Sequence, residues 1–511
     1  MNAITRKRLA KRKAKIRRRL RPIRWTAQPR PMLAAANIRY ELADRVGGIA
    51  CGGIGLMHLM ARRTGLVEAL DANLHLLKAH LPYHESDHVL NIAYNILVGG
   101  TCLEDLELRR NDVHYLDALG AQRIPDPTTA GDFCRRFRAE DIERLMQTIN
   151  QVRLQVWHRQ SQSFFEEAVL DADGVIAATD GQCKEGMGLS YDGRWGYHPL
   201  VLSLANTGEP LFLVNRGGNR PSNEGAAERF DQALALVRGA GFRKVLFRGD
   251  TDFSQTTHLD RWDEAGVRFI FGMDAKSNLV GIADGLGAKQ WKPLPRRVPR
   301  PVLTAPRARP ENVRQRIVRE RGYRNHRLES EQVAWFAYRP WRCKRSYRMV
   351  VVRKNLSVER GERALFDEVR YFFYITNDRR SSDDEIVRLA NQRCDQENLN
   401  EQLRNGVRAL RMPLDNLLSN WAYMVMASLA WTLKAWTALL LPRQGRWKDR
   451  EQAEAHALLR MEFKTFRHAL VELPCQIVRT SRRIVYRLLS WNPWQHVFLR
   501  AVEALRLPMR C

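Results

Sequence analysis

The chain has 511 residues, of which 84 are Lys or Arg and 56 are Asp or Glu, so its formal net charge at pH 7 is +28. Its length predicts roughly two to four domains, and 44% apolar residues with 13 Trp argue against a largely disordered chain. A charge this positive predicts a polyanionic partner, most commonly nucleic acid, with a membrane surface as the alternative.

The sequence predicts neither a secretion signal nor a membrane anchor. The basic N-terminus is not followed by an apolar segment of the kind that signal peptides carry. The longest apolar stretch, residues 417–441, is interrupted by Asn420 and Lys434, which favours a buried core helix over a membrane span. The eight cysteines form no C-x-x-C pair, so neither a zinc site nor a disulfide framework is predicted. We expect a reducing, cytoplasmic environment.

Residues 1–35 are expected to form a basic, disordered arm. Residues 1–30 contain 13 Lys or Arg, including Arg17, Arg18 and Arg19, and no acidic residue. Like charges at this density repel one another, and near phosphates they release counterions and bind without reading sequence. A solubility tail is the alternative. Subtracting 13 from +28 leaves +15 on the remainder, so the folded part is basic as well.

Residues 36–160 are predicted to form a helical DNA-binding domain, because apolar residues recur there at helical spacing. Asp126 and Pro127 are suited to begin a helix, and Arg135 and Arg136 follow on its polar face. A short basic helix after a tight entry resembles the second helix of a helix-turn-helix. An ordinary amphipathic helix fits the same pattern.

Residues 161–275 are predicted to form a mixed α/β sheet with helices on its faces. Strand patterns and helix patterns alternate in the order strand, strand, strand, helix, strand, helix, strand: 167–178, 193–204, 210–215, 224–240, 244–250, 259–265 and 267–273. In the first strand Asp171 and Asp173 lie two residues apart, so both point to the same face. Asp250 ends the fourth strand, where α/β sheets commonly bind ligands.

The second half of the chain is predicted to contain a β-rich insertion (276–380), a helix that returns to the core (381–411) and a helical C-terminal region (412–511). Residues 386–404 contain no Gly or Pro and are predicted to form one helix. Arg393, Glu397, Glu401 and Arg404 share its polar face. Taken alone, this pattern is typical of a solvated helix with ion pairs.

Three separated carboxylates suggest a metal site: Asp173 (or Asp171), Asp250 and Glu397. Carboxylates brought together repel unless a cation neutralises them, and hard ions such as Mg²⁺ or Mn²⁺ prefer oxygen ligands. Two such ions can activate a water or a 3′-hydroxyl and stabilise the leaving oxygen in phosphoryl transfer. The alternative is structural, with Asp250 capping a turn and Asp173 in a salt bridge.

Three motifs in this order resemble the DDE transposases of bacterial insertion sequences, which have an RNase H-like core. The motifs are Leu170-Asp-Ala-Asp-Gly174, Arg248-Gly-Asp-Thr-Asp-Phe253 and the helix at 386–404. The most similar group carries the helix signature Y-(2)-R-(3)-E-(6)-K. Arg393 and Glu397 match it, Arg404 replaces the Lys, and Ala390 stands where the signature has Tyr. The resemblance extends from about residue 80 to residue 440.

The resemblance implies that Asp173, Asp250 and Glu397 are the catalytic residues and hold two Mg²⁺ or Mn²⁺ ions. It prefers Asp173 to Asp171, which is a candidate to support the metal ligands from behind. It also implies double-stranded DNA as the partner, both at the element's inverted-repeat ends and at the target, and a homodimer in the DNA complex. The arginines expected to contact DNA are Arg393, Arg404, Arg248, Arg135, Arg136, Arg17, Arg18 and Arg19. A metal-dependent nuclease and a catalytically silent DNA-binding protein remain the alternatives.

Overall fold

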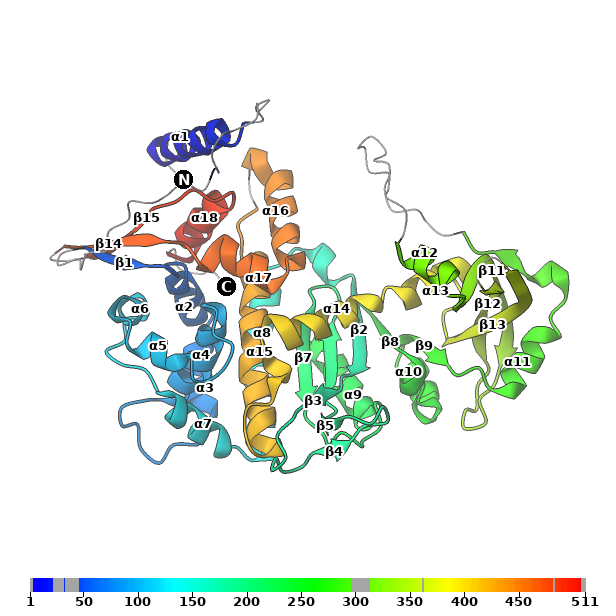
Figure 1. Ribbon diagram of the computed structural model, residues 1–511. Coiled ribbons are helices and arrows are strands. Elements are labelled where there is room, and N and C mark those ends of the chain that lie inside the picture. The colour runs from blue at the N-terminus through cyan, green and yellow to red at the C-terminus, as the bar shows by residue number, and fades with distance from the viewer. Residues whose placement is uncertain are drawn as a thin grey trace.

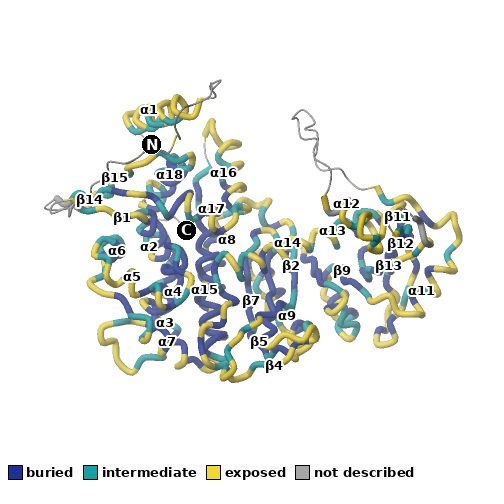
Figure 2. The backbone as a smooth tube through the Cα atoms, viewed as in Figure 1, coloured by how far each residue is buried: buried dark blue, intermediate teal, exposed yellow. Residues whose placement is uncertain are grey.

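A long buried helix runs through the middle of the molecule. The structure is a computed structural model, and it describes residues 3–21, 32, 46–295, 313–360, 363–443, 445–480 and 483–506. Helix α15 (Leu417–Leu439) lies between the N-terminal helices and the large sheet (Figure 1). All of its residues from Ser419 onward are buried, as the dark blue tube in Figure 2 shows, which confirms the predicted core helix. Within the described ranges, no helix is long and apolar enough to cross a membrane.

The N-terminal and C-terminal helical regions, predicted as two domains, pack against each other and around α15 (Figure 1). Strand β1 pairs with β14 near the C-terminus, and α18 packs on α2. The N-terminal elements are β1 (Gly47–Ile49), α2 (Ile54–Arg63), α3 (Leu66–Asn73), α4 (Glu85–Leu97), α5 (Leu106–Arg110), α6 (Val113–Leu119), α7 (Pro127–Arg135) and α8 (Ala139–Trp157). The C-terminal elements are α16 (Lys448–Arg460), α17 (Phe463–Phe466), β14 (Cys475–Thr480), β15 (Arg483–Leu488) and α18 (Gln495–Arg506).

The basic N-terminal segment differs from the disordered arm that its charge predicts. Residues Ala3–Arg19 form helix α1, because Ala, Leu, Lys and Arg are strong helix formers. The Arg12 guanidinium donates to the carbonyl of Leu488 at 2.9 Å, which attaches α1 to the end of β15. Arg17, Arg18 and Arg19 are exposed in its last turn. Residues 1–2, 22–31 and 33–35 of the predicted arm lie outside the described residues.

The mixed sheet has nine strands in the order β10-β11-β12-β13-β9-β8-β2-β6-β7. Strand β2 pairs antiparallel with β6 and parallel with β8, so the sheet changes direction at β2. This confirms the RNase H-like mixed α/β arrangement, in which three strands, a helix, a strand, a helix and a strand follow one another. Its elements are β2 (Glu167–Gly174), β6 (Leu200–Leu204), β7 (Glu209–Val214), α9 (Ala226–Gly239), β8 (Lys244–Gly249), α10 (Leu259–Glu264) and β9 (Arg268–Met273).

Two predicted strands are shorter in this sheet than the sequence suggested. The strand predicted at 167–178 ends at Gly174, and the strand predicted at 193–204 begins only at Leu200. Pro199 interrupts the predicted strand 193–204, because proline has no backbone N–H to donate. The residues before it form β5 (Trp195–Tyr197), which pairs instead with β3 (Ala177–Ala178) and β4 (Gly188–Leu189) in a separate small sheet.

The β-rich insertion extends the same large sheet. Strand β13 pairs antiparallel with β9 from Phe373 opposite Met273 to Thr376 opposite Ile270. This pairing places the insertion directly beside the carboxyl ends of the core strands. Its elements are α11 (Ser277–Asp284), β10 (Lys292–Pro293), α12 (Val313–Glu320), β11 (Arg324–Tyr338), β12 (Tyr347–Arg360) and β13 (Arg363–Thr376).

The helix predicted at 386–404 is divided into three parts. Helix α13 (Asp383–Asn391) ends before a tight turn at Gln392 and Arg393, α14 (Cys394–Glu401) follows, and a π-helical turn (Gln402–Gly406) completes the segment. The N–H of Gln396 bonds to the carbonyl of Arg393, three residues back, so the turn is tighter than an α-helix. Helix α13 packs on β9 and the insertion strands, whereas α14 packs on β2.

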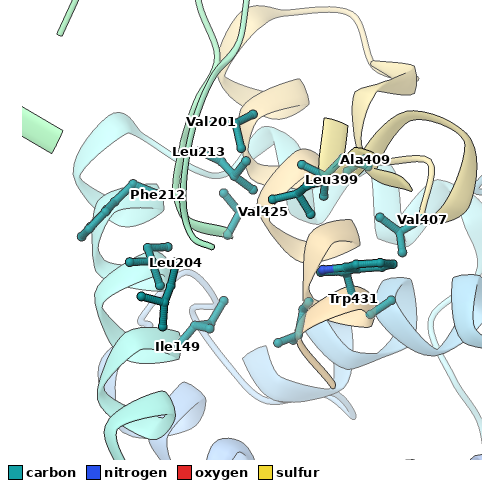
Figure 3. Close-up of a cluster of buried hydrophobic side chains, with 14 of the residues drawn as sticks. Ile149, Val201, Leu204, Phe212, Leu213, Leu399, Val407, Ala409, Val425 and Trp431 are labelled. Atoms are coloured by element: carbon teal, nitrogen blue, oxygen red, sulfur yellow. The ribbon is translucent and has the colours of Figure 1, made fainter. Parts of the chain in front are cut away.

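A buried polar network joins α8, β7 and α15. The Glu209 carboxylate is fully buried and accepts hydrogen bonds from Arg153 Nε at 3.0 Å, Trp157 Nε1 at 3.0 Å and Trp436 Nε1 at 2.9 Å. An apolar cluster from α8, β6, β7, α14 and α15 lies around these elements, including Ile149, Leu204, Leu399 and Val425 (Figure 3). The two buried charges, Arg153 and Glu209, would destabilise the fold if either lost its partner.

Glu209→Gln is expected to lower the free energy of unfolding by about 3–5 kcal/mol, because it leaves the buried Arg153 charge without a carboxylate. Denaturation followed by tryptophan fluorescence measures this, since Trp157 and Trp436 bond to Glu209 directly. The matched control is Glu107→Gln, which breaks an exposed, solvent-screened pair with Arg110 and is expected to cost far less stability. Equal effects of the two substitutions would contradict a structural role for the network.

Candidate active site

Three carboxylates from separate parts of the chain surround one guanidinium. Arg393 Nη1 lies 3.7 Å from Asp173 Oδ1, and Arg393 Nη2 lies 3.9 Å from Asp250 Oδ2 and 3.7 Å from Glu397 Oε1. Asp173 belongs to β2, Asp250 directly follows β8, and Glu397 lies in α14. The structure therefore brings together the three acids and the arginine that the sequence motifs singled out.

Local backbone geometry sets where each acid points. Asp173 lies near the end of β2, next to the parallel strand β8, which ends one residue before Asp250. Asp250 Oδ1 also accepts the N–H of Asp252 at 3.0 Å and so caps the 3₁₀ turn Thr251–Phe253. Glu397 lies four residues after Arg393, so the two side chains lie on the same helix face.

Asp171 and Arg248 form a buried pair behind these acids. Arg248 Nε donates to Asp171 Oδ1 at 2.7 Å and Arg248 Nη2 donates to Asp171 Oδ2 at 2.6 Å. Arg248 Nη1 donates to the carbonyl of Leu389 at 2.8 Å. These contacts connect β2, β8 and α13, the elements that carry or precede the three acids. The sequence predicted that Arg248 contacts DNA. In this structure it is only 3% exposed and bonds to Asp171 instead.

Burial and repulsion raise the pKa of the first acid. The pKa of Asp173 is raised to about 7, first by burial and then by the nearby charges of Asp250 and Glu397, while Arg393 acts in the opposite direction. Asn400 Nδ2 donates to Asp173 Oδ2 at 2.8 Å. Burial also raises the pKa of Asp250, again opposed by Arg393. Added positive charge would therefore stabilise the ionised forms of Asp173 and Asp250.

The donor set fits a hard divalent cation in chemistry and charge. Three carboxylates are the oxygen ligands that Mg²⁺ and Mn²⁺ prefer, and one arginine, Arg393, lies among them. Their oxygens are spaced around Arg393, and among the described residues no three His, Cys, Asp or Glu side chains lie close enough together to hold a metal ion as they stand.

The remaining arginines expected to contact DNA lie in several places. Arg404 Nη2 donates to the carbonyl of Ile176 at 2.8 Å and is partly exposed. Arg135 pairs with Asp132 at 2.9 Å and with Asp415 at 3.1 Å, both on the surface. Arg136 is exposed at the end of α7. Asp126 caps α7 by accepting the N–H of Thr129, as the sequence indicated.

Two neighbours of the acids were not found from the sequence. Asn400, which bonds to Asp173, lies three residues after Glu397 on the same helix face, so helical spacing could have identified it. Tyr374 of β13 lines a cavity of about 370 Å³ together with Asp250, Ala390 and Arg393. Its position depends on the pairing of β13 with β9, for which the sequence holds no local signal.

Comparison with known protein families identifies the family of this chain. Residues 48–509 match the family described as Transposase DDE domain group 1. The chain belongs to this family. Comparison with curated proteins gives no match. Among solved structures, the chain is similar to a piggyBac transposase in a synaptic complex with hairpin DNA, at 9% identity and a TM-score of 0.36, over 83% of this chain and 84% of that one. That likeness is too low to support any statement about this chain.

Asp173→Asn is expected to stabilise the metal-free transposase at pH 8 by up to about 4 kcal/mol and to leave it unchanged at pH 4. Because the folded pKa of about 7 exceeds the ordinary value of 3.8, wild-type stability falls as pH rises between these two values. Melting temperatures across that range measure the difference. Asp180→Asn, at an exposed position, serves as control. A stabilisation that does not vary with pH would contradict this electrostatic origin.

Arg248→Lys is expected to reduce DNA cleavage at least about tenfold and to leave the salt dependence of DNA binding unchanged, because lysine cannot reproduce the two-pronged contact with Asp171. The measurement is the slope of log K against log[salt], which falls by about one for each lost phosphate contact. Arg136→Gln, at an exposed position, is the comparison. A reduced slope for Arg248→Lys would show that this residue contacts DNA after all.

Proposed function

We propose that this chain is the transposase of a bacterial insertion sequence, which binds the inverted-repeat ends of its element, cleaves the DNA and joins the freed 3′-hydroxyl to target DNA. The observation that supports this most directly is the convergence of Asp173, Asp250 and Glu397 on Arg393 from three distant segments. Membership of a DDE transposase family gives the reaction class. The chain would act in the bacterial cytoplasm, on the nucleoid.

Asp173, Asp250 and Glu397 would hold two Mg²⁺ or Mn²⁺ ions. When bound, such ions activate the attacking water or hydroxyl and stabilise the leaving oxygen. The protein's own residues prepare the acids for this task. Asn400 orients Asp173 through its hydrogen bond, Arg393 partly neutralises all three acids, and the Asp171–Arg248 pair holds their elements together. Asp173 must lose its proton to act as a ligand, and burial raises the pKa of Asp173, so metal binding is expected to strengthen as pH rises.

The DNA surface would include the exposed arginines of α1 and α7 together with Arg404 in the turn that follows α14. The net charge of +28 supports strong binding that weakens with salt. Two element ends must be held at once for strand transfer, so the active assembly with DNA would contain at least two copies of the chain. Figure 1 shows α1 on the outer side of the N-terminal and C-terminal helices.

Glu397→Gln is expected to reduce cleavage at least about 10³-fold while DNA affinity stays within twofold, since it removes a metal ligand and no cation. The assay uses labelled DNA that carries the sequences flanking the gene of this chain, with Mg²⁺. Glu401→Gln is the matched control, because Glu401 lies four residues further along and bonds to Asn405. Full activity of Glu397→Gln would rule out the site assignment.

Pre-cut DNA ends distinguish the transposase from its two rivals. A transposase joins such ends to a supercoiled plasmid, a nuclease on the same fold degrades DNA without joining, and a silent DNA-binding protein does neither. The three intact acids favour an enzyme over the silent alternative.

A further inference from the structure

The short helix α14, which carries Glu397, buries two polar side chains against the sheet. The helix is described along its whole length, and its buried residues are Gln396, Leu399 and Asn400. Leu399 belongs to the apolar cluster of Figure 3, and Asn400 donates to Asp173. Gln396 directly precedes Glu397 and is only 2% exposed. Burial of an amide costs free energy unless the amide is hydrogen-bonded, so the partners of Gln396 are informative.

The partners of Gln396 belong to β6, the strand that pairs with the strand of Asp173. The buried Ser203 hydroxyl donates to Gln396 Oε1, and Gln396 Nε2 donates to the Val201 carbonyl at 3.5 Å, which is long for a hydrogen bond. In the antiparallel pairing of β2 with β6, Ser203 lies opposite Asp171 and Val201 lies opposite Asp173. Gln396 therefore attaches α14 to the two residues that lie directly across from the acidic motif of β2.

Helix α14 does not continue into a longer α-helix on either side. A tight turn at Gln392 and Arg393 precedes it, and the π-helical turn Gln402–Gly406 follows it. Its position on the sheet therefore depends on its own contacts. Apolar contacts are non-directional, whereas a hydrogen bond restricts both distance and direction. Because each residue turns an α-helix by about 100°, a shift of α14 by one residue would carry Glu397 away from the other acids.

Repulsion among the acids makes a firm attachment of α14 important. Asp173, Asp250 and Glu397 carry like charges, and Arg393 lies 3.7 Å, 3.9 Å and 3.7 Å from them. These distances are too long for hydrogen bonds, so Arg393 attracts the acids without fixing their geometry. The Glu397 side chain is 64% exposed, compared with 14% for Asp173. Among the three acids, Glu397 thus has the fewest contacts with its surroundings and depends most on how its helix is held.

We propose that Gln396 is a positioning residue whose hydrogen bond with Ser203 fixes α14 on the sheet and so keeps Glu397 close to Asp173, where both acids can take part in metal binding. This inference rests on the proposed function. It adds to the three acids a buried residue that binds through β6 instead of contacting metal or DNA itself. Residues that orient metal ligands from behind commonly matter in this way, since their loss weakens metal binding by about 10- to 100-fold.

The test measures Mn²⁺ binding to the full-length protein without DNA, from the loss of the free Mn²⁺ signal in electron paramagnetic resonance. Gln396→Met replaces the amide with an apolar side chain of similar length and is expected to weaken Mn²⁺ binding at least about tenfold. Asn398→Met is the matched control, because Asn398 flanks Glu397 on its other side and is exposed; its Mn²⁺ affinity is expected to stay within about twofold of the wild type. A folded Gln396→Met variant with wild-type Mn²⁺ affinity would overturn the proposal.

Ser203→Ala separates the hydrogen bond from the packing of residue 396. It removes only the hydroxyl and is expected to weaken Mn²⁺ binding in the same direction. The double variant of Ser203→Ala with Gln396→Met is expected to bind Mn²⁺ no more weakly than Gln396→Met alone, because both changes break one bond. Additive losses would contradict the proposal. If circular dichroism shows that Gln396→Met does not fold, Ser203→Ala decides alone, and its unchanged Mn²⁺ affinity would count against the role of Gln396.

DNA cleavage gives a second readout that a merely structural role would not move. With DNA that carries the sequences flanking the gene, the Mn²⁺ concentration for half-maximal cleavage is expected to rise at least about tenfold in Gln396→Met. A partly unfolded sample would lower the maximal rate and leave that concentration unchanged, which would contradict the proposal. A wild type that neither binds Mn²⁺ nor cleaves DNA would refute the proposed function itself. A wild type that does both, with Gln396→Met equal to it, would refute only the role of Gln396.

Discussion

The buried contact of Arg248 with Asp171 and with the Leu389 carbonyl is the constraint on which the site depends. A buried ion pair adds little net stability unless its hydrogen bonds are complete, because both charges lose their water. Here the guanidinium satisfies both carboxylate oxygens and one backbone carbonyl. Its value is geometric. It connects the strand that carries Asp173, the strand that precedes Asp250 and the helix that leads to Arg393, so the three acids keep a fixed spacing.

Much of this arrangement could be predicted from the sequence, because it is encoded locally. Strand alternation placed Asp171 and Asp173 on one face, and helical spacing placed Arg393 near Glu397. Burial then separates the roles that alternation left open, since Asp171 is 1% exposed and bound to Arg248, whereas Asp173 faces the other acids. The divided helix could not be predicted, because the turn at Gln392 and Arg393 contains neither Gly nor Pro. Its cause is tertiary, since α13 packs on the insertion and α14 packs on β2.

Contacts between distant parts of the chain also limited what could be predicted for the insertion. Its strands were recognisable from β-branched and aromatic residues, but the pairing of β13 with β9 joins residues about a hundred positions apart. Strand partners at that distance are chosen by the whole sheet and leave no local pattern. The same pairing brings Tyr374 to the acids, so the part of the site that sequence motifs missed is the part that nonlocal pairing creates. For the N-terminal segment, the prediction of disorder rested on its charge, whereas its residue types favour the helix that the structure contains.

The distribution of charge gives a reason why such a protein would bind DNA without damaging it. The chain has a net charge of +28, yet the three acids of its candidate active site form a group with one arginine among them. A DNA strand that approaches these acids alone meets like charge that one arginine only partly cancels. On the proposed function, divalent ions would remove that repulsion and supply the catalysis at the same time. On the proposed function, DNA binding therefore depends on salt and the basic surface, whereas cleavage depends on metal ions and the acids, and the two can be controlled separately.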